Sequence, residues 1–371
     1  MLEGGGAMEY RVNPKTGDKI SVIGLGTSYI SESSEREAVK ALELAYENGI
    51  NYADLATAGS KTFGYYGKAL ASVRTNMYYQ VHFGAYYDNG EYAWTTELDT
   101  VKRSIDFQLR ELKTDYIDYG FIHCIDSESD FEDYKENGVL QYLLDMKKQG
   151  VVHHIGVSSH TPKVANKILD LGIADMLMFS INPGYDYQHG EYAHGEALER
   201  MKLYQRCEAE GIGISVMKPF SGGQLLDAKT SPFGKALSVY QCIQYALDKP
   251  AVLTVLPGIG NAEDVKRLLK FFEISEQEKD YSVIGSFTPK DMSGVCVYCN
   301  HCQPCPAGID IGLVNKYYDL ALAGDEMAVD HYRKLSVYAD ACLKCGHCES
   351  RCPFRVKQES RMEEINLYFS K

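Results

Sequence analysis

Eight short apolar segments, separated by segments of helical periodicity, constrain the fold of this 371-residue chain more than any other feature. The apolar segments have strand length and span residues 20–27, 51–56, 77–84, 116–124, 153–160, 176–182, 213–220 and 252–259. Between them, apolar residues recur at steps of three and four, as Val101, Ile105 and Leu109 do. Eight strands alternating with helices over about 250 residues predict an α/β chain folded as a (β/α)8 TIM barrel. A doubly wound open sheet also alternates, but it usually has fewer units and needs a glycine-rich motif that "GLGTSYI" matches poorly.

The composition disfavours two classes of partner. The net charge of −13 disfavours nucleic acid, which is bound by clustered Lys and Arg, and it disfavours an anionic membrane surface. No apolar run approaches the ~20 residues of a membrane-spanning helix, and the start, "MLEGGGAMEYR", lacks the apolar core of a signal peptide. Most of the 11 cysteines fall in two tight clusters with metal-ligand spacing, which favours a reducing cytoplasm over a disulfide-bonded secreted protein.

Polar side chains stand at the carboxyl ends of the predicted strands, where (β/α)8 barrels carry their active sites. They are Asp54, His82, His123, His160, Asn182 and Lys218. Any one of these histidines can be a half-buried packing residue, but three on one rim, in a chain with only 10 histidines, indicate a functional mouth. Carboxylate and imidazole groups there can move protons. They are also a normal ligand set for a divalent Zn, Mn or Fe ion.

Several motifs are shared, in order and spacing, with one enzyme superfamily. They include "GINYADLA", "LRELKTDYIDYGFIH", "GVVHHIGVSSHTP", "VMKPFSGG" and "VLPGIGNAEDV". Over residues 8–272 the chain resembles the aldo-keto reductase superfamily. The resemblance implies a (β/α)8 barrel that reduces carbonyl compounds with NADPH. It also implies a catalytic tetrad of Asp, Tyr, Lys and His in which the tyrosine is the general acid.

Only half of that tetrad is retained. By the resemblance, Asp54 in "YADLA" and His123 in "FIH" match the aspartate and the histidine of the family. Gly59 stands where the tyrosine is expected, and His82 stands where the lysine is expected. Carbonyl reduction needs a proton for the nascent alkoxide. We therefore expect a substitute donor, either His82, whose imidazole titrates near neutrality, or one of the nearby Tyr65 and Tyr66.

The nicotinamide site is altered as well. After the eighth strand, Gly258 precedes a predicted helix with Asn261 as its N-cap, and a phosphate can bind at such an N-terminus. Asp264, three residues on, repels a ribose phosphate, so NAD(P)H stays an open alternative as the cofactor. Lys218 and Gly222, in the glycine-rich stretch "KPFSGG", offer further contacts to anionic groups.

Two cysteine runs predict a second domain that handles electrons. The first run contains Cys296, Cys299, Cys302 and Cys305, the second contains Cys342, Cys345, Cys348 and Cys352, and a proline follows each. The second run has the C-x2-C-x2-C-x3-C-P spacing of bacterial ferredoxins, and the last gap of the first run is one residue shorter. The pattern predicts two [4Fe–4S] clusters. Zinc is the alternative, since paired C-x2-C also binds zinc.

The segment between the two cysteine runs has a helical pattern. Leu313 and Tyr317 begin this pattern, so the domain is expected to be mainly helical. We expect three parts, which are the barrel at residues 8–272, a linker at 273–295 and a helical ferredoxin-like iron–sulfur domain at 296–371. Some aldo-keto reductase-like proteins carry such a C-terminal domain, and this chain resembles them.

Together, these features favour a cytoplasmic oxidoreductase that acts on a small carbonyl or hydroxyl substrate at the barrel mouth. Two [4Fe–4S] clusters would pass electrons received from a ferredoxin or a flavoprotein. Three alternatives stay open: an NAD(P)H-dependent carbonyl reductase with a substitute proton donor, a metal-dependent non-redox enzyme, and an electron-transfer subunit whose barrel is a relic.

Overall fold

The described part of the chain forms two compact units. The computed structural model describes residues 7–27, 29–187, 190, 192–286, 293–296, 298, 302–322, 326–352 and 354–370. Unit 1 comprises Met1–Ile181, Ile212–Pro219 and Leu253–Ile274, and unit 2 comprises Asn182–Gly211, Phe220–Val252 and Ser275–Lys371. No helix among the described residues is long and apolar enough to cross a bilayer.

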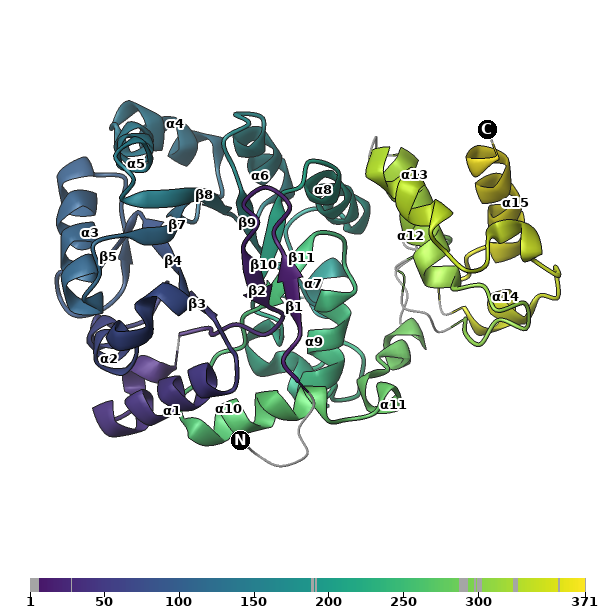
Figure 1. Ribbon diagram of the computed structural model, residues 1–371, viewed down its shortest axis with the longest axis horizontal. Coiled ribbons are helices and arrows are strands. Elements are labelled where there is room, and N and C mark those ends of the chain that lie inside the picture. Colours follow the sequence, from purple (N-terminus) through teal and green to yellow (C-terminus); the bar gives the residue numbers. More distant parts are fainter. Residues whose placement is uncertain are drawn as a thin grey trace. The chain divides into compact units, whose positions relative to one another are not determined.

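Unit 1 is built on a parallel barrel (Figure 1). Its strands, in barrel order, are β3 (Tyr52–Asp54), β4 (Tyr78–Phe83), β7 (Ile117–Ile122), β8 (Val152–Ser158), β9 (Met176–Ser180), β10 (Gly213–Met217) and β11 (Val252–Val255). From β3 to β10, each strand pairs in parallel with the next. The segment 23–26 closes the cylinder, since Ile23 bridges Val255 and Leu25 bridges Ala53, both in parallel. The predicted α/β barrel is confirmed.

The first predicted strand, residues 20–27, is divided in the structure. Its start forms β2 (Lys19–Ser21), which pairs with β1 (Tyr10–Val12) in an antiparallel hairpin. Only its second half joins the barrel. A Cβ at Gly26 would lie 2.7 Å from the carbonyl oxygen of Leu256. The glycine therefore allows the close backbone approach by which this segment closes the barrel through isolated bridges.

Helices surround the strands of unit 1 (Figure 1). They are α1 (Glu35–Glu47), α2 (Lys61–Ala69), α3 (Leu98–Leu112), α4 (Glu128–Glu136), α5 (Val139–Lys148), α6 (Pro162–Leu169) and α10 (Ala262–Leu269), with 3-10 turns η1 (Ile30–Glu32), η2 (Ala71–Asn76) and η4 (Lys270–Phe272). A short hairpin follows β4 and is formed by β5 (Ala85–Tyr86) and β6 (Ala93–Trp94). Tyr119, Phe121 and Met176 belong to one buried cluster, as the filled interior of such a barrel requires.

Helices α2 and α3 pack closely at Gly67, where a Cβ would overlap the carbonyl oxygen of Glu111. Gly67→Ala is expected to lower the free energy of unfolding by about 1–3 kcal/mol, because the overlapping atom belongs to the backbone and cannot turn aside. Gly64→Ala, on the same helix, is the matched control, since its Cβ would lie 3.7 Å from the nearest atom. The urea unfolding midpoints of the two variants measure the difference. Equal midpoints would contradict the close approach of α2 and α3 at Gly67.

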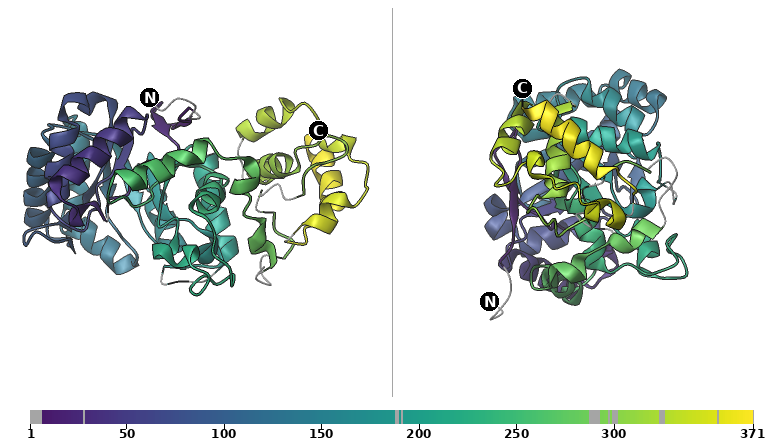
Figure 2. Two further views of the ribbon diagram at one scale, coloured as in Figure 1. Left: turned by 90° about the horizontal axis from the view of Figure 1, so that it is seen from below. Right: turned by 90° about the vertical axis from the view of Figure 1, so that its right-hand side faces the viewer.

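Unit 2 is mainly helical (Figure 2). Its helices are α7 (Pro183–Asp186), α8 (Ala197–Ala209), α9 (Val239–Leu247), α11 (Glu276–Lys279), α12 (Ile311–Leu322), α13 (Glu326–Arg333), α14 (His347–Arg351) and α15 (Gln358–Phe369), with 3-10 turns η3 (Ser221–Leu226), η5 (Ser282–Ser286) and η7 (Ala339–Ala341). The helix predicted from Leu313 and Tyr317 is confirmed by α12. Val314, Tyr332 and Ile365, from α12, α13 and α15, share one buried cluster.

Candidate active site

Three predicted mouth residues meet at the carboxyl ends of neighbouring strands. Asp54 ends β3, His82 lies near the end of β4, and His123 directly follows β7. His82 Nε2 lies 2.7 Å from Asp54 Oδ1, and His82 Nδ1 lies 2.8 Å from His123 Nδ1. The series ends at Tyr92, whose hydroxyl lies 2.8 Å from His123 Nε2. We call Asp54, His82, His123 and Tyr92 the mouth relay.

With both rings neutral, only one set of hydrogen-bond directions satisfies the contacts of the mouth relay. The Asp54 carboxylate accepts, so His82 Nε2 donates to it, and His82 Nδ1 is left as an acceptor. His123 Nδ1 then donates to His82. This leaves His123 Nε2 to accept the proton of the Tyr92 hydroxyl. Gln80 also donates its amide nitrogen to Asp54 Oδ1, at 3.2 Å, which helps to hold the carboxylate in place.

Burial keeps the His123 ring neutral. Burial, followed by the neighbouring His82, holds the pKa of His123 well below its usual value. His82 is itself only 1% exposed, so it can support a proton transfer without meeting a substrate. Tyr92 is 40% exposed and is therefore the member of the mouth relay that a substrate can reach.

Tyr92 lies in the hairpin after β4 and was not among the site residues predicted from the sequence. This hairpin pairs with the loop from which the family tyrosine is missing. Gly59 bridges Glu91 in antiparallel register, and the Tyr92 amide donates to the Ala58 carbonyl at 3.0 Å. A neighbouring loop thus supplies a phenol next to the glycine. The available signal was the tyrosine-rich stretch 86–94, which lacks helical periodicity although a helix was due after the strand.

Tyr65 and Asn182 have local structural partners. The Tyr65 hydroxyl donates to the Ser33 carbonyl at 3.2 Å, so it is engaged outside the mouth relay. In unit 2, Asn182 caps α7 and accepts a hydrogen bond from the Tyr185 amide at 2.9 Å. Such a cap is a sufficient reason for a buried asparagine at that position.

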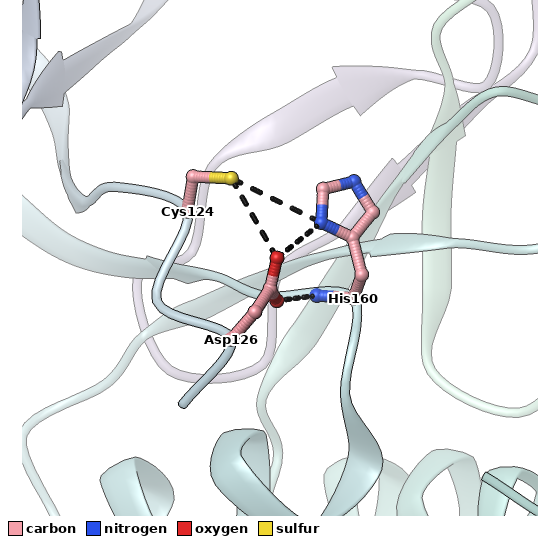
Figure 3. A group of neighbouring side chains, drawn as sticks. All are labelled: Cys124, Asp126 and His160. Carbon is pink, nitrogen blue, oxygen red and sulfur yellow. Dashed lines mark hydrogen bonds and ion pairs between the residues drawn. The ribbon is translucent and has the colours of Figure 1, made fainter. Parts of the chain in front are cut away.

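His160 lies with Cys124 and Asp126 in a second polar group, drawn in Figure 3. Its Nδ1 lies 2.9 Å from Asp126 Oδ2 and 3.9 Å from Cys124 Sγ, and the thiol lies 3.8 Å from the same carboxylate oxygen. Burial, and then the Asp126 charge, raises the pKa of Cys124 to about 12. Burial also opposes ionisation of Asp126, but hydrogen bonds from His160 outweigh it and hold the pKa of Asp126 at about 2.

The start of α10 does not fit a bound phosphate. Asn261 Oδ1 accepts from the amides of Glu263 and Asp264, and Asp264 Oδ2 accepts from the amides of Gly260 and Asn261. The amides that a phosphate needs are therefore already bonded, and two carboxylates lie in the first turn. The predicted N-cap at Asn261 is confirmed. Its use as a cofactor ligand is disfavoured by these contacts.

The other residues considered for an anionic cofactor lie in loops. Lys218 follows β10 with a φ of 52°, and Gly222 has a φ of 64° within η3 of unit 2. The ring of Tyr29 lies against Gly258, since a Cβ there would be 2.7 Å from it. A role of these three positions in cofactor binding stays a prediction.

Cysteines from both runs line one pocket of unit 2, which we call the cysteine pocket. It is lined by Cys305, Cys342, Cys345 and Cys348, together with Ile309, Met362 and other side chains. Cys296, Cys302 and Cys352 lie in the same unit. Cys299 lies outside the described residues.

The comparisons with known proteins agree with the barrel. Residues 22–239 match the Aldo/keto reductase family. L-galactose dehydrogenase of Arabidopsis thaliana is 24% identical over 291 residues, which cover 70% of this chain and 86% of that protein. The uncharacterized oxidoreductase YqkF of Bacillus subtilis is 23% identical over 294 residues, covering 74% of this chain and 94% of that protein.

A solved structure gives the same result at the level of the fold. The aldo-keto reductase AKR11C1 from Bacillus halodurans, in its holo form, aligns with a TM-score of 0.61 and 20% identity. The alignment covers 73% of this chain and 94% of that one. Because the family match spans more than half of the chain, this protein belongs to the Aldo/keto reductase family and is an oxidoreductase of that type.

Proposed function

We propose that the chain is an iron–sulfur oxidoreductase that interconverts a small carbonyl compound and its alcohol at the barrel mouth, with electrons passed through two [4Fe–4S] clusters. The cysteine pocket is the observation that carries the proposal. In two-cluster ferredoxins each run gives three cysteines to one cluster and its fourth to the other. The cysteine pocket combines the last cysteine of the first run, Cys305, with the first three of the second run. The remaining set for a second cluster is Cys296, Cys299, Cys302 and Cys352.

The ferredoxin spacing of the second cysteine run in the sequence supports a cluster over a single zinc ion. Thiolates around one zinc ion lie about 3.8 Å apart, given a Zn–S distance of about 2.3 Å. Across the described ranges, only Cys124, Asp126 and His160 bring three donor atoms within 4.8 Å of one another. No three thiols among the described residues of the cysteine pocket lie that close together, so a tetrahedral zinc site is not preformed there.

The mouth relay handles the protons of the proposed reaction. In the state with a neutral His123, an alcohol can give its proton to the Tyr92 oxygen while Tyr92 passes its own proton to His123 Nε2. With His123 protonated, the same transfer runs in reverse, toward an alkoxide. Asp54, linked through His82, stabilises the charged form of the pair of rings. Bound clusters would supply or remove two single electrons for each carbonyl, and the second proton, which the alcohol carries on carbon, would be exchanged with solvent at the mouth.

The electron partner is proposed to be a ferredoxin or a flavoprotein. Family members typically use NAD(P)H, but the capped and acidic start of α10 disfavours a nicotinamide cofactor in this chain. The proposed clusters offer a route for electrons that does not need a nicotinamide cofactor.

An anaerobic titration of the purified full-length protein tests the proposal. Dithionite is expected to bleach the broad visible absorption of the clusters, whereas sub-millimolar NADPH or NADH is expected to leave it unchanged. Bleaching by either nucleotide would overturn the choice of electron partner. A colourless protein without iron, after anaerobic reconstitution with iron and sulfide, would overturn the cluster assignment itself.

Cys345→Ser is expected to remove one cluster and to leave the other. Iron per chain should fall from about eight to about four atoms, because the substituted thiol is one corner ligand of a single cubane. Elemental analysis after reconstitution measures this ratio. The matched control is Cys207→Ala, a buried cysteine outside both runs, which should keep the full iron content. Equal iron in the two variants would contradict the assignment of Cys345.

A further inference from the structure

Two loops at the carboxyl ends of adjacent strands bring three potential metal ligands together. Cys124 and Asp126 follow β7, and His160 follows β8, which pairs with β7. Figure 3 shows the thiol, one carboxylate oxygen and one ring nitrogen turned toward a common point. Their three separations are 2.9 Å, 3.8 Å and 3.9 Å.

A thiol, an imidazole and a carboxylate also occur together in cysteine nucleophile triads, but this geometry is different. In such a triad the imidazole relays a proton, so the thiol and the carboxylate face different ring nitrogens. Here Cys124 Sγ and Asp126 Oδ2 both face His160 Nδ1. One nitrogen cannot pass a proton between two partners on the same side. Three donor atoms converging on one point are instead the arrangement of a metal site.

We propose that Cys124, Asp126 and His160 bind a single divalent zinc ion. Tetrahedral coordination, with Zn–S of about 2.3 Å and Zn–N or Zn–O of about 2.0–2.1 Å, places neighbouring donor atoms roughly 3.3–3.6 Å apart. The separations in this group differ from those values by a few tenths of an ångström, which side-chain rotation can provide. Thiolate with imidazole selects zinc among the common divalent ions.

The surroundings hold the ligands in place, as in known metal sites. Asp126 Oδ1 accepts from the backbone amide of His160 and, at 3.1 Å, from the Ser159 hydroxyl. These bonds orient the carboxylate so that Asp126 Oδ2 is aimed at the thiol. Cys124 has a φ of 51°, a left-handed conformation that non-glycine residues rarely adopt. Such backbone strain occurs mainly where function fixes a side chain.

The proposed ion would have a catalytic role at the barrel mouth, not the structural role of a zinc ion with four protein ligands. Three protein ligands leave a fourth position for water or for a substrate oxygen, which is the pattern of catalytic zinc. Cys124 directly follows His123 of the mouth relay in the chain. The site would therefore take a carbonyl or hydroxyl oxygen and polarise it next to the relay.

Cobalt(II), a spectroscopic substitute for zinc, tests the site in the full-length protein as purified. Anaerobic difference spectra are expected to show saturable binding of about one cobalt ion per chain, with the intense visible bands of four-coordinate cobalt and a thiolate-to-cobalt charge-transfer band. Added zinc should displace the cobalt. Cys124→Ser should abolish the charge-transfer band, and Asp126→Asn and His160→Gln should each weaken binding at least tenfold, on the order expected for a lost ligand.

The matched control is Cys242→Ser, at a buried thiol outside both cysteine runs, which should bind cobalt as the wild type does. Iron content, measured in every sample, separates this site from the cysteine runs and makes the result independent of the proposed function. Unchanged cobalt spectra in Cys124→Ser would overturn the proposal. Failure of the well-folded wild-type protein to bind cobalt saturably would overturn it as well.

Discussion

The Tyr92→Phe protein is expected to turn over its substrate about 10²–10⁴-fold more slowly than the wild type, the range typical of losing a positioned general acid or base. The phenol is the group of the mouth relay that a substrate can reach, since Asp54, His82 and His123 are only 6%, 1% and 4% exposed. Phenylalanine keeps the ring and removes the hydroxyl that contacts His123 Nε2. The loss should therefore fall on kcat, with a smaller effect on KM.

A panel of small aldehydes, ketones and alcohols, assayed anaerobically with reduced or oxidised protein, identifies a substrate for this comparison. Tyr86→Phe, on the same hairpin, is the control and should retain wild-type turnover. A second readout needs no substrate. The nitrogen NMR signals of His123 should shift in Tyr92→Phe, because Nε2 loses its hydrogen-bond donor. Unchanged turnover together with unchanged His123 signals would remove Tyr92 from the mechanism.

Asp186→Ala is expected to lower the free energy of unfolding by about 3–5 kcal/mol, the cost of leaving a buried charge without its partner. Within unit 2, Asp186 Oδ1 accepts from Arg200 Nε at 2.8 Å and from the Tyr204 hydroxyl at 2.7 Å. Its other oxygen accepts from the Tyr245 hydroxyl at 2.7 Å. Arg200 is fully buried, so water cannot replace the lost carboxylate.

Urea unfolding, followed by circular dichroism, measures this effect. The double variant Asp186→Leu/Arg200→Met removes both charges and should recover much of the lost stability, because two apolar side chains need no ionic partner. Lys163→Ala, at an exposed ion pair with Glu128, should change stability by no more than about 1 kcal/mol. A small effect in Asp186→Ala, similar to that of Lys163→Ala, would show that the remaining contacts of Arg200, such as its bond to the His194 carbonyl at 3.2 Å, are enough to hold the buried charge.

The barrel could be predicted because the sequence patterns that specify its strands and helices are local. Each strand is a short apolar run and each helix repeats every three to four residues, and these patterns depend only on which face is buried. The first strand was the exception. Residues 23–26 join both neighbours through isolated bridges, which depend on the backbone approach that Gly26 allows and not on periodicity.

Only those residues of the candidate site that lie at the ends of strands could be predicted from the sequence. Asp54, His82 and His123 are fixed by the strands that carry them. The position of Tyr92 depends on antiparallel pairing between two loops that lie far apart in sequence, and a pattern within one loop cannot reveal it. For the same reason Cys124 was a scattered cysteine in the sequence, although the structure brings it within 4 Å of His160.

The hairpin that carries Tyr92 links proton transfer to the opening of the barrel mouth. Backbone bonds from Ser60 to Gly90 and from Tyr92 to Ala58 hold it in place. Any outward movement of the hairpin that admits a substrate or releases a product breaks these bonds and withdraws the Tyr92 hydroxyl from His123. The Tyr92–His123 contact that carries the proton therefore lasts only while these two loops stay paired.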